Sequence, residues 1–354
     1  MFTALVLAAV LSGPGQLPPF PGLVRKEFIY ETAPFPECHA STLVESGGTL
    51  LAAWFGGKEE KDPSVGIWVS RREGGKWTAP VEVADGVQAD GKRLPCWNPV
   101  LFQPRKGDLV LFYKVGPTPS TWWGMVKTSK DQGKTWGAAT RLPSLADGIG
   151  IVGPIKNKPV ELADGTWLSG CSTEHDGWRV HFERSTDQGK TWTATVPVAM
   201  PKKFNAIQPS ILTHKDGMLQ AIGRTKNQKV FTTTSSDGGK TWSEMGTLNL
   251  PNPNSGTDAV TLADGRHLLV YNHTTTGRRP LNVAISSDGK TWSALGTLEV
   301  DRGEFSYPAV IQAANGLIQI SYTWKRQKVR VVTLNPEGFQ PEPIAANGRW
   351  PEGR

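Results

Sequence analysis

Six segments of the chain share one pattern, in which an apolar-rich stretch, a glycine turn and a second apolar-rich stretch follow one another. Each segment begins with a residue that differs from copy to copy: His39, Asn98, Lys158, Gln208, Asp258 and Tyr307. The second stretch ends seven residues after the turn glycine, at Phe55, Lys114, Ser172, Arg224, Asn272 and Thr323. Structural residues should repeat between copies, so these variable positions are candidates for lining one asymmetric ligand site. The alternative is that strand ends beside a water-filled channel are polar anyway.

The residue types at and near these positions suit an anionic sugar. Arginine binds carboxylate through two parallel hydrogen bonds, and indole rings stack on pyranose faces. The candidate binding residues are Arg224, Arg278, Lys114, Lys158, Gln208, Asn98, Asp258, Trp178 and Arg179, and carboxylates also occur at Glu37, Asp62, Glu174 and Glu304. The stretch 172–183 is the densest cluster, but its His175 and His181 lie in a segment where polar and apolar residues alternate. We therefore expect neither a metal site nor a cofactor.

A second repeat indicates the elements that position these side chains. The sequence Ser-x-Asp-x-Gly-x-Thr-Trp occurs at 129–136, 185–192 and 235–242, in a shortened form at 286–292 and in a degenerate form at 70–77. It has the chemistry of a hairpin turn, since Asp accepts backbone N–H bonds and Gly adopts positive φ. Its tryptophans recur after 59, 56, 50 and 50 residues. Short strands with this period predict propeller blades, and the turns themselves have no catalytic role.

We therefore predict an all-β fold, a six-bladed β-propeller that spans residues 17–340 as one domain, with a C-terminal tail at 341–354. The sixth copy has no turn motif and stops near Val332, so a strand around residues 28–31 is expected to pair with it and close the ring. Residues 2–11 are apolar and are followed by small and helix-breaking residues. This resembles a secretory signal over residues 1–16, too short to span a bilayer, and predicts a secreted or periplasmic protein. The alternative for this segment is a buried strand.

The composition of the chain limits the classes of partner that the protein is expected to bind. The net charge is +7 and the pI about 9.2, but the basic residues are spread along the chain. We expect an acidic glycan or oligosaccharide as partner, no nucleic acid, no membrane insertion and a monomer. The three cysteines, Cys38, Cys96 and Cys171, lack metal-ligand spacing and read as buried thiols. Five of the 14 tryptophans belong to the turns; candidate sugar platforms are Trp54, Trp97, Trp122, Trp123, Trp178 and Trp324.

The turn motif on a six-bladed register resembles the sialidase (neuraminidase) superfamily, with its Asp-box repeats, over roughly residues 35 to 335. The resemblance implies that Arg224 and Arg278 hold a substrate carboxylate and that Tyr307 is the nucleophile. It also implies that Asp62 is the acid/base residue. Two positions depart from the family pattern. Glu37-Cys38-His39 stands where the family has its first arginine, and Gln208 stands where it has the glutamate that activates the tyrosine.

A tyrosine nucleophile needs a base or a cationic environment. Glu304, Glu174 or Asp258 are candidate bases, and Lys158 or Arg224 are candidate cations. Alternatively, His39 or Asp62 acts as acid with a carboxylate as base. The resulting hypothesis is an exo-acting glycoside hydrolase that cleaves a terminal, sialic-acid-like acidic sugar. The alternatives are a glycosidase or polysaccharide lyase for another uronate or deoxy-sugar glycan, with His39, Lys114, His181 and Tyr307 as acid/base residues, or a carbohydrate-binding propeller without chemistry.

Overall fold

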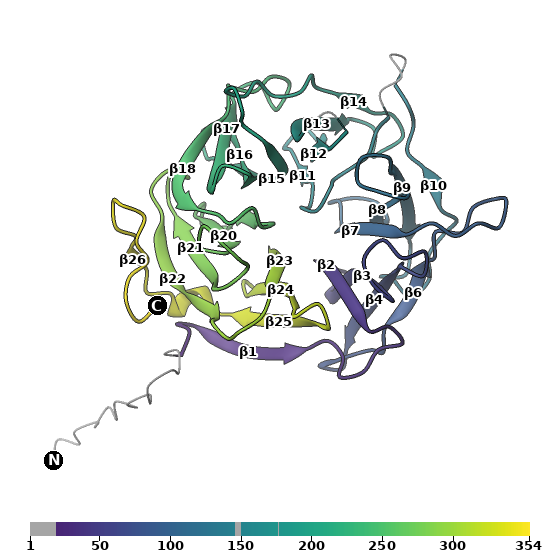
Figure 1. Ribbon diagram of the computed structural model, residues 1–354, viewed down its shortest axis with the longest axis horizontal. Helices are drawn as coiled ribbons and strands as arrows, with labels where there is room; N and C mark the ends of the chain where they lie inside the picture. Colours follow the sequence, from purple (N-terminus) through teal and green to yellow (C-terminus); the bar gives the residue numbers. More distant parts are fainter. Residues whose placement is uncertain (1–18, 146–149, 176) are drawn as a thin grey trace.

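The computed structural model describes residues 19–145, 150–175 and 177–354, and forms six antiparallel sheets arranged around a central axis (Figure 1). The expected signal segment 1–16 lies outside the described residues. Blade one contains β2 (Glu37–Ser46), β3 (Thr49–Gly57), β4 (Gly66–Glu73), β5 (Lys76–Trp77) and β6 (Val81–Ala84). Blade two contains β7 (Cys96–Phe102), β8 (Leu109–Val115), β9 (Trp123–Ser129) and β10 (Thr140–Arg141). Blade three contains β11 (Val160–Glu161), β12 (Trp167–Thr173), β13 (Arg179–Ser185) and β14 (Thr193–Ala194).

The second half of the chain repeats this arrangement. Blade four contains β15 (Ala206–Thr213), β16 (Leu219–Thr225), β17 (Lys229–Ser235) and β18 (Gly246–Pro251). Blade five contains β19 (Asp258–Thr261), β20 (His267–Tyr271), β21 (Leu281–Ser286), β22 (Ser293–Glu299) and β26 (Glu342–Pro343). Blade six contains β23 (Phe305–Gln312), β24 (Ile318–Trp324), β25 (Lys328–Leu334) and β1 (Leu23–Phe28). A short 3₁₀ turn, η1 (Pro336–Gly338), follows β25. The predicted six-bladed, all-β architecture is confirmed.

The ring is closed by the N-terminal strand, as predicted, although slightly earlier in the sequence than expected. β1 pairs antiparallel with β25, and Phe28 lies opposite Arg330. This pairing covers the outer edge of blade six (Figure 1). The C-terminal residues lie against blade five, since β26 pairs with β22 and the Thr297 hydroxyl donates to the carbonyl of Arg354.

The repeated turns form the hydrogen bonds that their sequence predicts. In the turn of blade three, Asp187 accepts bonds from the backbone N–H and the hydroxyl of Thr191, at 2.8 and 2.6 Å. The Ser185 hydroxyl donates to the same carboxylate and accepts from the N–H of Gly189. The turns of blades two, four and five repeat the Ser–Asp and Gly–Ser bonds. Each turn is therefore satisfied by its own residues.

The space between blades is filled by apolar side chains from neighbouring sheets. Trp54 and Trp97 are buried in this packing, Trp54 against Tyr30 and Trp97 against Phe55, so the expectation that they serve as sugar platforms is wrong. Their indoles are large enough to fill the gaps that a propeller leaves between twisted sheets. All three cysteines are buried and free, as expected. Over the described residues no helix is long and apolar enough to cross a membrane.

Candidate active site

Strained backbone at the start of three inner strands presents polar side chains to the centre of the ring. Asn98, Gln208 and Tyr307 have positive φ angles of 35°, 59° and 51°, and each precedes a proline. The pairing register shifts at the same points, between Trp97 and Val100, Ile207 and Ser210, and Ser306 and Ala309. Such bulges redirect a side chain out of the regular alternation of a strand. In blade one the matching positive φ falls on Ala40, one residue after His39.

The phenol of Tyr307 accepts two hydrogen bonds. Arg224 Nη1 donates to its oxygen at 2.9 Å, and Gln208 Nε2 donates at 3.2 Å. A longer contact of 3.4 Å from Arg224 Nη1 to Gln208 Oε1 keeps the amide in this orientation. Two converging donors stabilise negative charge on the phenolic oxygen. The sequence-predicted Tyr307, Gln208 and Arg224 thus lie together.

His39 lies against the same tyrosine. The two ring centroids are 4.1 Å apart, and His39 Nδ1 lies 3.1 Å from the Thr323 hydroxyl. Burial, followed by the positive charges of Arg326, Arg278, Arg224 and Lys156, holds the pKa of His39 well below its usual value. His39 is therefore neutral at neutral pH, and the surrounding cations make it a weaker base than an exposed imidazole.

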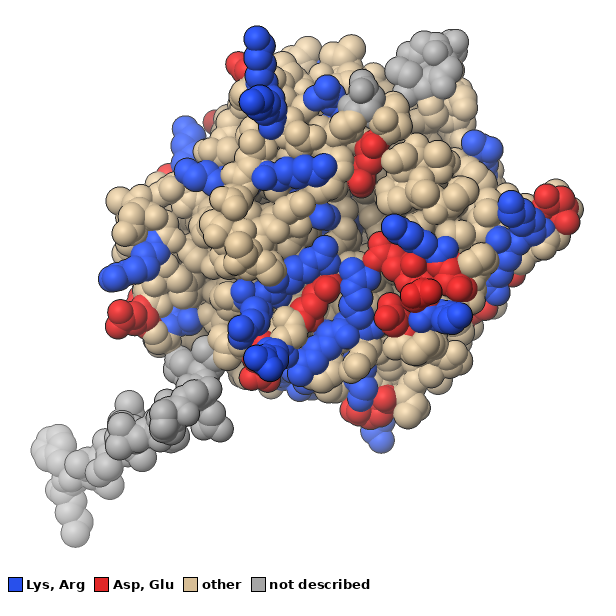
Figure 2. All heavy atoms as spheres, viewed as in Figure 1, with Lys and Arg blue, Asp and Glu red and all other residues tan. Residues whose placement is uncertain are grey.

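A chain of ion pairs runs along the mouth from blade five to blade one. Arg278 Nη1 lies 2.7 Å from Glu304 Oε1, and Arg326 Nε lies 3.3 Å from the same oxygen. Arg326 also bonds Glu60 of the β3–β4 loop. In Figure 2 basic side chains gather at one edge of the central hollow, over the β24–β25 region, and acidic ones lie beside them, over the β3–β4 region. Glu304 and Arg278 were expected at the site, whereas Arg326 and Glu60 were not.

One feature of the sequence could have predicted that Arg326 lies at the site. Three residues separate β24 from β25, and the first two, Lys325 and Arg326, have positive φ angles of 53° and 58° in a turn that the Gln327 N–H closes by donating to the Trp324 carbonyl. β24 is the second strand of blade six, as β16, which contains Arg224, is the second strand of blade four. Both strands end at the mouth, so the turn after β24 places Arg326 at the mouth. The charge pattern alone does not reveal this, because Lys325–Arg330 reads as an ordinary basic surface run.

The rim of blade three contributes an aromatic ring and a carboxyl group. Arg224 and Lys226 lie over the half-buried Trp178, 4.9 and 4.3 Å from its ring centroid. Burial raises the pKa of Glu174, although Arg224 and a hydrogen bond to Trp178 oppose the shift. Glu174 therefore retains its proton to higher pH than an exposed glutamate. Arg179 is exposed at the start of β13.

The loop that contains Asp62 contacts the residues of the mouth through a different carboxylate, that of Glu60. Asp62 Oδ1 accepts the N–H of Ser64 at 2.8 Å, and this bonding to Ser64 lowers the pKa of Asp62. Glu60 is the residue of this loop that bonds Arg326. Asp62 is thus held in its own turn and favours the ionised form.

Several of the predicted binding residues instead connect the blades. Lys158 Nζ lies 3.0 Å from Asp258 Oδ2, and Asp258 also accepts bonds from the Ser210 hydroxyl and the N–H of Val310. Asn98 Nδ2 donates to the carbonyl of Ile155. The hydrogen bonds that these side chains form are thus made to other parts of the protein.

Two buried lysines lie deeper in the ring. Lys114 donates to the carbonyl of Pro154, and burial lowers its pKa to about 8. Lys156 donates to Asn157 Oδ1, Thr257 O and Pro308 O, and burial lowers its pKa to about 7. Lys156 Nζ lies 5.9 Å from the ring centroid of Tyr307, so it adds positive charge beneath the phenol. Lys156 thereby connects blades three, five and six directly below the candidate nucleophile.

One buried group of potential metal ligands occurs in the described part of the chain, at Cys171, His181 and Glu183. The Glu183 carboxylate accepts the N–H groups of Val152 and Gly153 at 2.9 and 2.7 Å and lies 3.1 Å from His181 Nε2. Its charge is compensated by these donors, which also explains why its pKa is lowered despite burial. Within this group, the Glu183 carboxylate is therefore already bonded by groups of the protein.

Comparisons with known proteins agree with the fold described above. The sequence model of the BNR repeat-like domain matches residues 48–320. No curated protein matches the chain. Among solved structures, a protein of unknown function from Dyadobacter fermentans has a TM-score of 0.75 and 20% identity, and the match covers 90% of this chain and 99% of that one.

Sialidase structures match over similar lengths. The intramolecular trans-sialidase of Ruminococcus gnavus has a TM-score of 0.74 and 15% identity, with coverage of 91% and 99% of the two chains. The NanB sialidase of Streptococcus pneumoniae has a TM-score of 0.71 and 14% identity, with coverage of 94% of this chain and 72% of that one. At these identities the likeness shows a shared fold.

Proposed function

The chain belongs to the BNR repeat-like domain family, and from the cationic surroundings of Tyr307 we propose that it is an exo-acting glycoside hydrolase that removes a terminal, sialic-acid-like acidic sugar from glycans. The observation that carries this proposal is the pair of hydrogen bonds from Arg224 and Gln208 to the phenolic oxygen. They orient the phenolic oxygen at the point where a nucleophile is needed, and the neighbouring cations suit an anionic ligand.

In the proposed reaction, the substrate carboxylate lies between Arg224, Arg278 and Arg326. Arg326 supplies the third guanidinium group, which the first-strand sequence Glu37-Cys38-His39 lacks. For this, the carboxylate shares Arg278 and Arg326 with Glu304, which already bonds both. Bidentate arginine–carboxylate bonds favour an acidic sugar over a neutral one.

The chemical steps need one nucleophile, one base and one acid. Tyr307 transfers its proton to His39 and attacks the anomeric carbon, while the bond from that carbon to the leaving oxygen breaks. Glu174 gives its proton to the leaving oxygen. Water then attacks the tyrosyl-linked sugar, Glu174 takes the proton of that water, and the departing phenolate recovers its own proton from His39.

A second function is favoured by one specific observation. Gln208 replaces a carboxylate base, and the neutral His39 packs on Tyr307, 4.1 Å between ring centroids. A neutral base beside cations that hold a carboxylate can also remove the proton next to that carboxylate in a uronate. The glycosidic oxygen then leaves by β-elimination, which gives an unsaturated sugar in place of a hydrolysed one.

One experiment separates these functions. Purified protein is incubated with sialyl, uronyl and rhamnosyl glycosides, and the products are analysed by mass spectrometry and ultraviolet absorbance. Release of free acidic sugar that is lost in Tyr307→Phe supports the hydrolase. An ultraviolet-absorbing unsaturated product supports elimination, and binding without turnover supports a carbohydrate-binding protein. Hydrolysis retained by Tyr307→Phe contradicts the proposed nucleophile.

The N-terminal sequence is the basis of a proposal about where the protein acts. We propose export to the periplasm or medium, on the basis of the apolar residues 2–11 and the small residues after them. N-terminal sequencing of the protein recovered from cell fractions tests this proposal. A mature chain that starts near residue 17 in the exported fraction supports it, and an intact Met1 in the cytosolic fraction contradicts it.

A further inference from the structure

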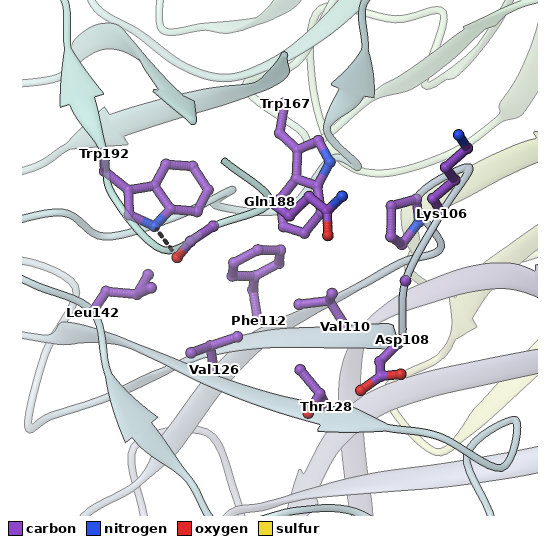
Figure 3. Close-up of a pocket in the computed structure, with 13 residues that line it drawn as sticks. Lys106, Asp108, Val110, Phe112, Val126, Thr128, Leu142, Trp167, Gln188 and Trp192 are labelled. Atoms are coloured by element: carbon purple, nitrogen blue, oxygen red, sulfur yellow. Dashed lines mark hydrogen bonds between the residues drawn. The ribbon is translucent and has the colours of Figure 1, made fainter. Parts of the chain in front are cut away.

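Two hollows of the molecule differ in the groups that they leave free. The cavity of about 420 Å³ between blades two and three is floored by Phe112, Trp167 and Trp192, whose side chains are almost fully buried (Figure 3). Phe112 packs edge-on against Trp192, with 6.1 Å between the ring centroids. These rings pack within the protein and leave no open face for a ligand. At the mouth, by contrast, one guanidinium group keeps a nitrogen without a partner.

Within the described residues, the hydrogen bonds of the Arg224 side chain go to uncharged groups. Its Nε donates to Asn254 Oδ1 at 2.8 Å, and its Nη1 donates to the Tyr307 phenol at 2.9 Å, with a longer contact of 3.4 Å to Gln208 Oε1. Its Nη2 makes no hydrogen bond in the described part of the chain and is not sealed off from solvent. The other two arginines of the proposed carboxylate site both pair with Glu304 instead. Arg224 therefore carries a charge that its bonded neighbours do not compensate.

The acceptor for Arg224 Nε comes from the loop of residues 252–257, which joins β18 to β19. At its start, the side chain of Asn252 bonds both the N–H and the carbonyl of Ser255, each at 3.0 Å. At its end, Lys156 Nζ donates to the carbonyl of Thr257 at 2.9 Å. The middle of the loop is therefore fixed from both sides.

The same loop lies directly against the candidate nucleophile. A Cβ atom on Gly256 would lie 3.2 Å from Tyr307 Cδ2 and 3.2 Å from Lys156 Cε, which is closer than carbon atoms normally pack. Glycine at this position thus allows the loop to approach the ring. Asn254 has a positive φ of 62°, a conformation that asparagine adopts more readily than most residues. The loop therefore places Asn254, Arg224 and Tyr307 in a defined arrangement.

We propose that Asn254 sets the affinity of the mouth for a carboxylate, because its neutral amide orients Arg224 without compensating the guanidinium charge. A carboxylate in place of this amide would accept the same bond from Nε but would form an ion pair with Arg224, as Glu304 does with the other two arginines. With the amide, Nη2 keeps its N–H groups and the full charge for an anionic group of the ligand. Asn254 is a positioning residue, since it acts through Arg224. The inference rests on the proposed function in one respect, that the ligand of the mouth carries a carboxylate.

The test follows the Nε–H signal of Arg224 by NMR in the full chain, at low salt and neutral pH, and assigns it by its loss in Arg224→Lys. The probes are acetate, N-acetylneuraminate and the methyl ester of N-acetylneuraminate. Asn254→Asp keeps the size and the acceptor oxygen of the side chain but adds a charge, whereas Asn254→Gly keeps the positive φ and removes the acceptor. The matched control is Asn315→Asp, in an exposed turn at the opposite strand ends, where the side chain accepts the Leu317 N–H at 3.1 Å.

In the wild type, both anions should shift the signal, and the ester should shift it less. Asn254→Asp should keep the signal and bind both anions about tenfold more weakly, with the ester unaffected, because the added carboxylate compensates Arg224. Asn254→Gly should lose the signal through rapid exchange of the unbonded Nε–H with water. Asn315→Asp should behave as the wild type does.

The acetate arm separates this inference from the proposed function. Acetate measures the charge available at Arg224 whatever sugar the mouth takes. Weaker acetate binding in Asn254→Asp therefore supports the proposal even if N-acetylneuraminate fails to bind, a result that would contradict the proposed sugar alone. The proposal is overturned if acetate leaves the wild-type signal unshifted up to about 100 mM. It is also overturned if Asn254→Asp binds acetate as tightly as the wild type does, if Asn315→Asp weakens binding equally, or if Asn254→Gly keeps the signal.

Discussion

The two ends of the propeller strands use acidic, basic and hydroxyl side chains in opposite ways. At the turn end, Asp131, Asp187 and Asp237 bond to the serine, threonine and backbone of their own turns, in the same arrangement from blade to blade. At the mouth, Tyr307 bonds to residues from blade four, and Arg326 bonds to a loop of blade one. Residues that repeat from blade to blade therefore serve the folding of each blade. Residues that differ between blades form the contacts of the mouth, which only the complete ring brings together.

The pKa shifts of side chains at the two ends have different causes, for the same reason. Hydrogen bonds from Thr191 lower the pKa of Asp187 to about 2 although it is open to solvent. At the mouth, burial and distant charges act instead: His39 is held neutral, and the pKa of Lys156 falls to about 7. Hydrogen bonds within one turn set the pKa values at the turn end, whereas burial and charges from several blades set the pKa values at the mouth. Substitutions at the two ends should therefore separate activity from stability.

The largest effect is expected for Arg224→Gln at the mouth. This change removes a charged donor at 2.9 Å from the Tyr307 oxygen, and kcat/KM on the acidic glycoside should fall by about 10³-fold. The control is Lys190→Gln, a charge removal in the exposed turn of blade three, which should leave kcat/KM within about twofold. Steady-state kinetics with both variants makes the comparison. A loss of equal size in the two variants would erase the proposed difference between the ends.

The next effect distinguishes two carboxyl groups of the mouth. Burial raises the pKa of Glu174, whereas the bonds from Ser64 lower the pKa of Asp62, so Glu174 is the better proton donor. Glu174→Gln should lower kcat by about 10²-fold and remove the fall in rate that follows deprotonation as pH rises through the pKa of Glu174. Asp62→Asn should change kcat by less than about threefold.

The pH–rate profile of both variants is measured with a poor and with a good leaving group. A good leaving group needs little protonation, so it should recover most of the rate in Glu174→Gln. If Asp62→Asn is the variant that loses rate and is recovered in this way, the acid belongs to the blade-one loop, as the family resemblance implies.

A smaller effect is expected for Arg326→Ala, which tests whether the turn after β24 belongs to the site. Loss of one charged partner should raise KM for the acidic substrate by about 10–100-fold and leave kcat less affected. Lys325→Ala, in the same turn, is the control. With the methyl ester of the substrate, wild type and Arg326→Ala should have similar KM values, because the carboxylate charge is absent. A KM that rises equally for acid and ester would make Arg326 a packing residue.

The sequence predicted most fully what depends on neighbours along the chain. The turns, the six blades and the closing strand follow from repeats, and the common register brought Tyr307, Gln208 and Arg224 together correctly. Lys114, Lys158 and Asp258 share that register, but their side chains bond to Pro154 and to one another across blades. Arg326 and Glu60 meet only because a hairpin turn and a loop, 266 residues apart, face the same mouth. Contacts of this kind depend on how blades are placed, which no local pattern records.

The smallest effect is expected at the turn end, and it concerns stability alone. The pKa of Asp187 is about 2 in the folded chain against an ordinary value of 3.8, so its bonds stabilise the fold above that ordinary value. This contribution is lost as pH falls through the folded pKa. Asp187→Asn should therefore lower Tm by a few degrees at pH about 7, and the difference from wild type should shrink as pH falls from about 4 to about 2.

Asn is the most informative substitution because it keeps the size of the aspartate side chain and one acceptor oxygen but cannot ionise. Calorimetric melting over this pH range measures the difference in Tm, and kcat at neutral pH should equal that of the wild type. A Tm difference that is constant with pH would mean that Asp187 acts through shape and not through charge. A lowered kcat would mean that a turn satisfied entirely by its own residues, at 2.6 Å from Asp187 to Thr191, still influences the opposite end of the blade.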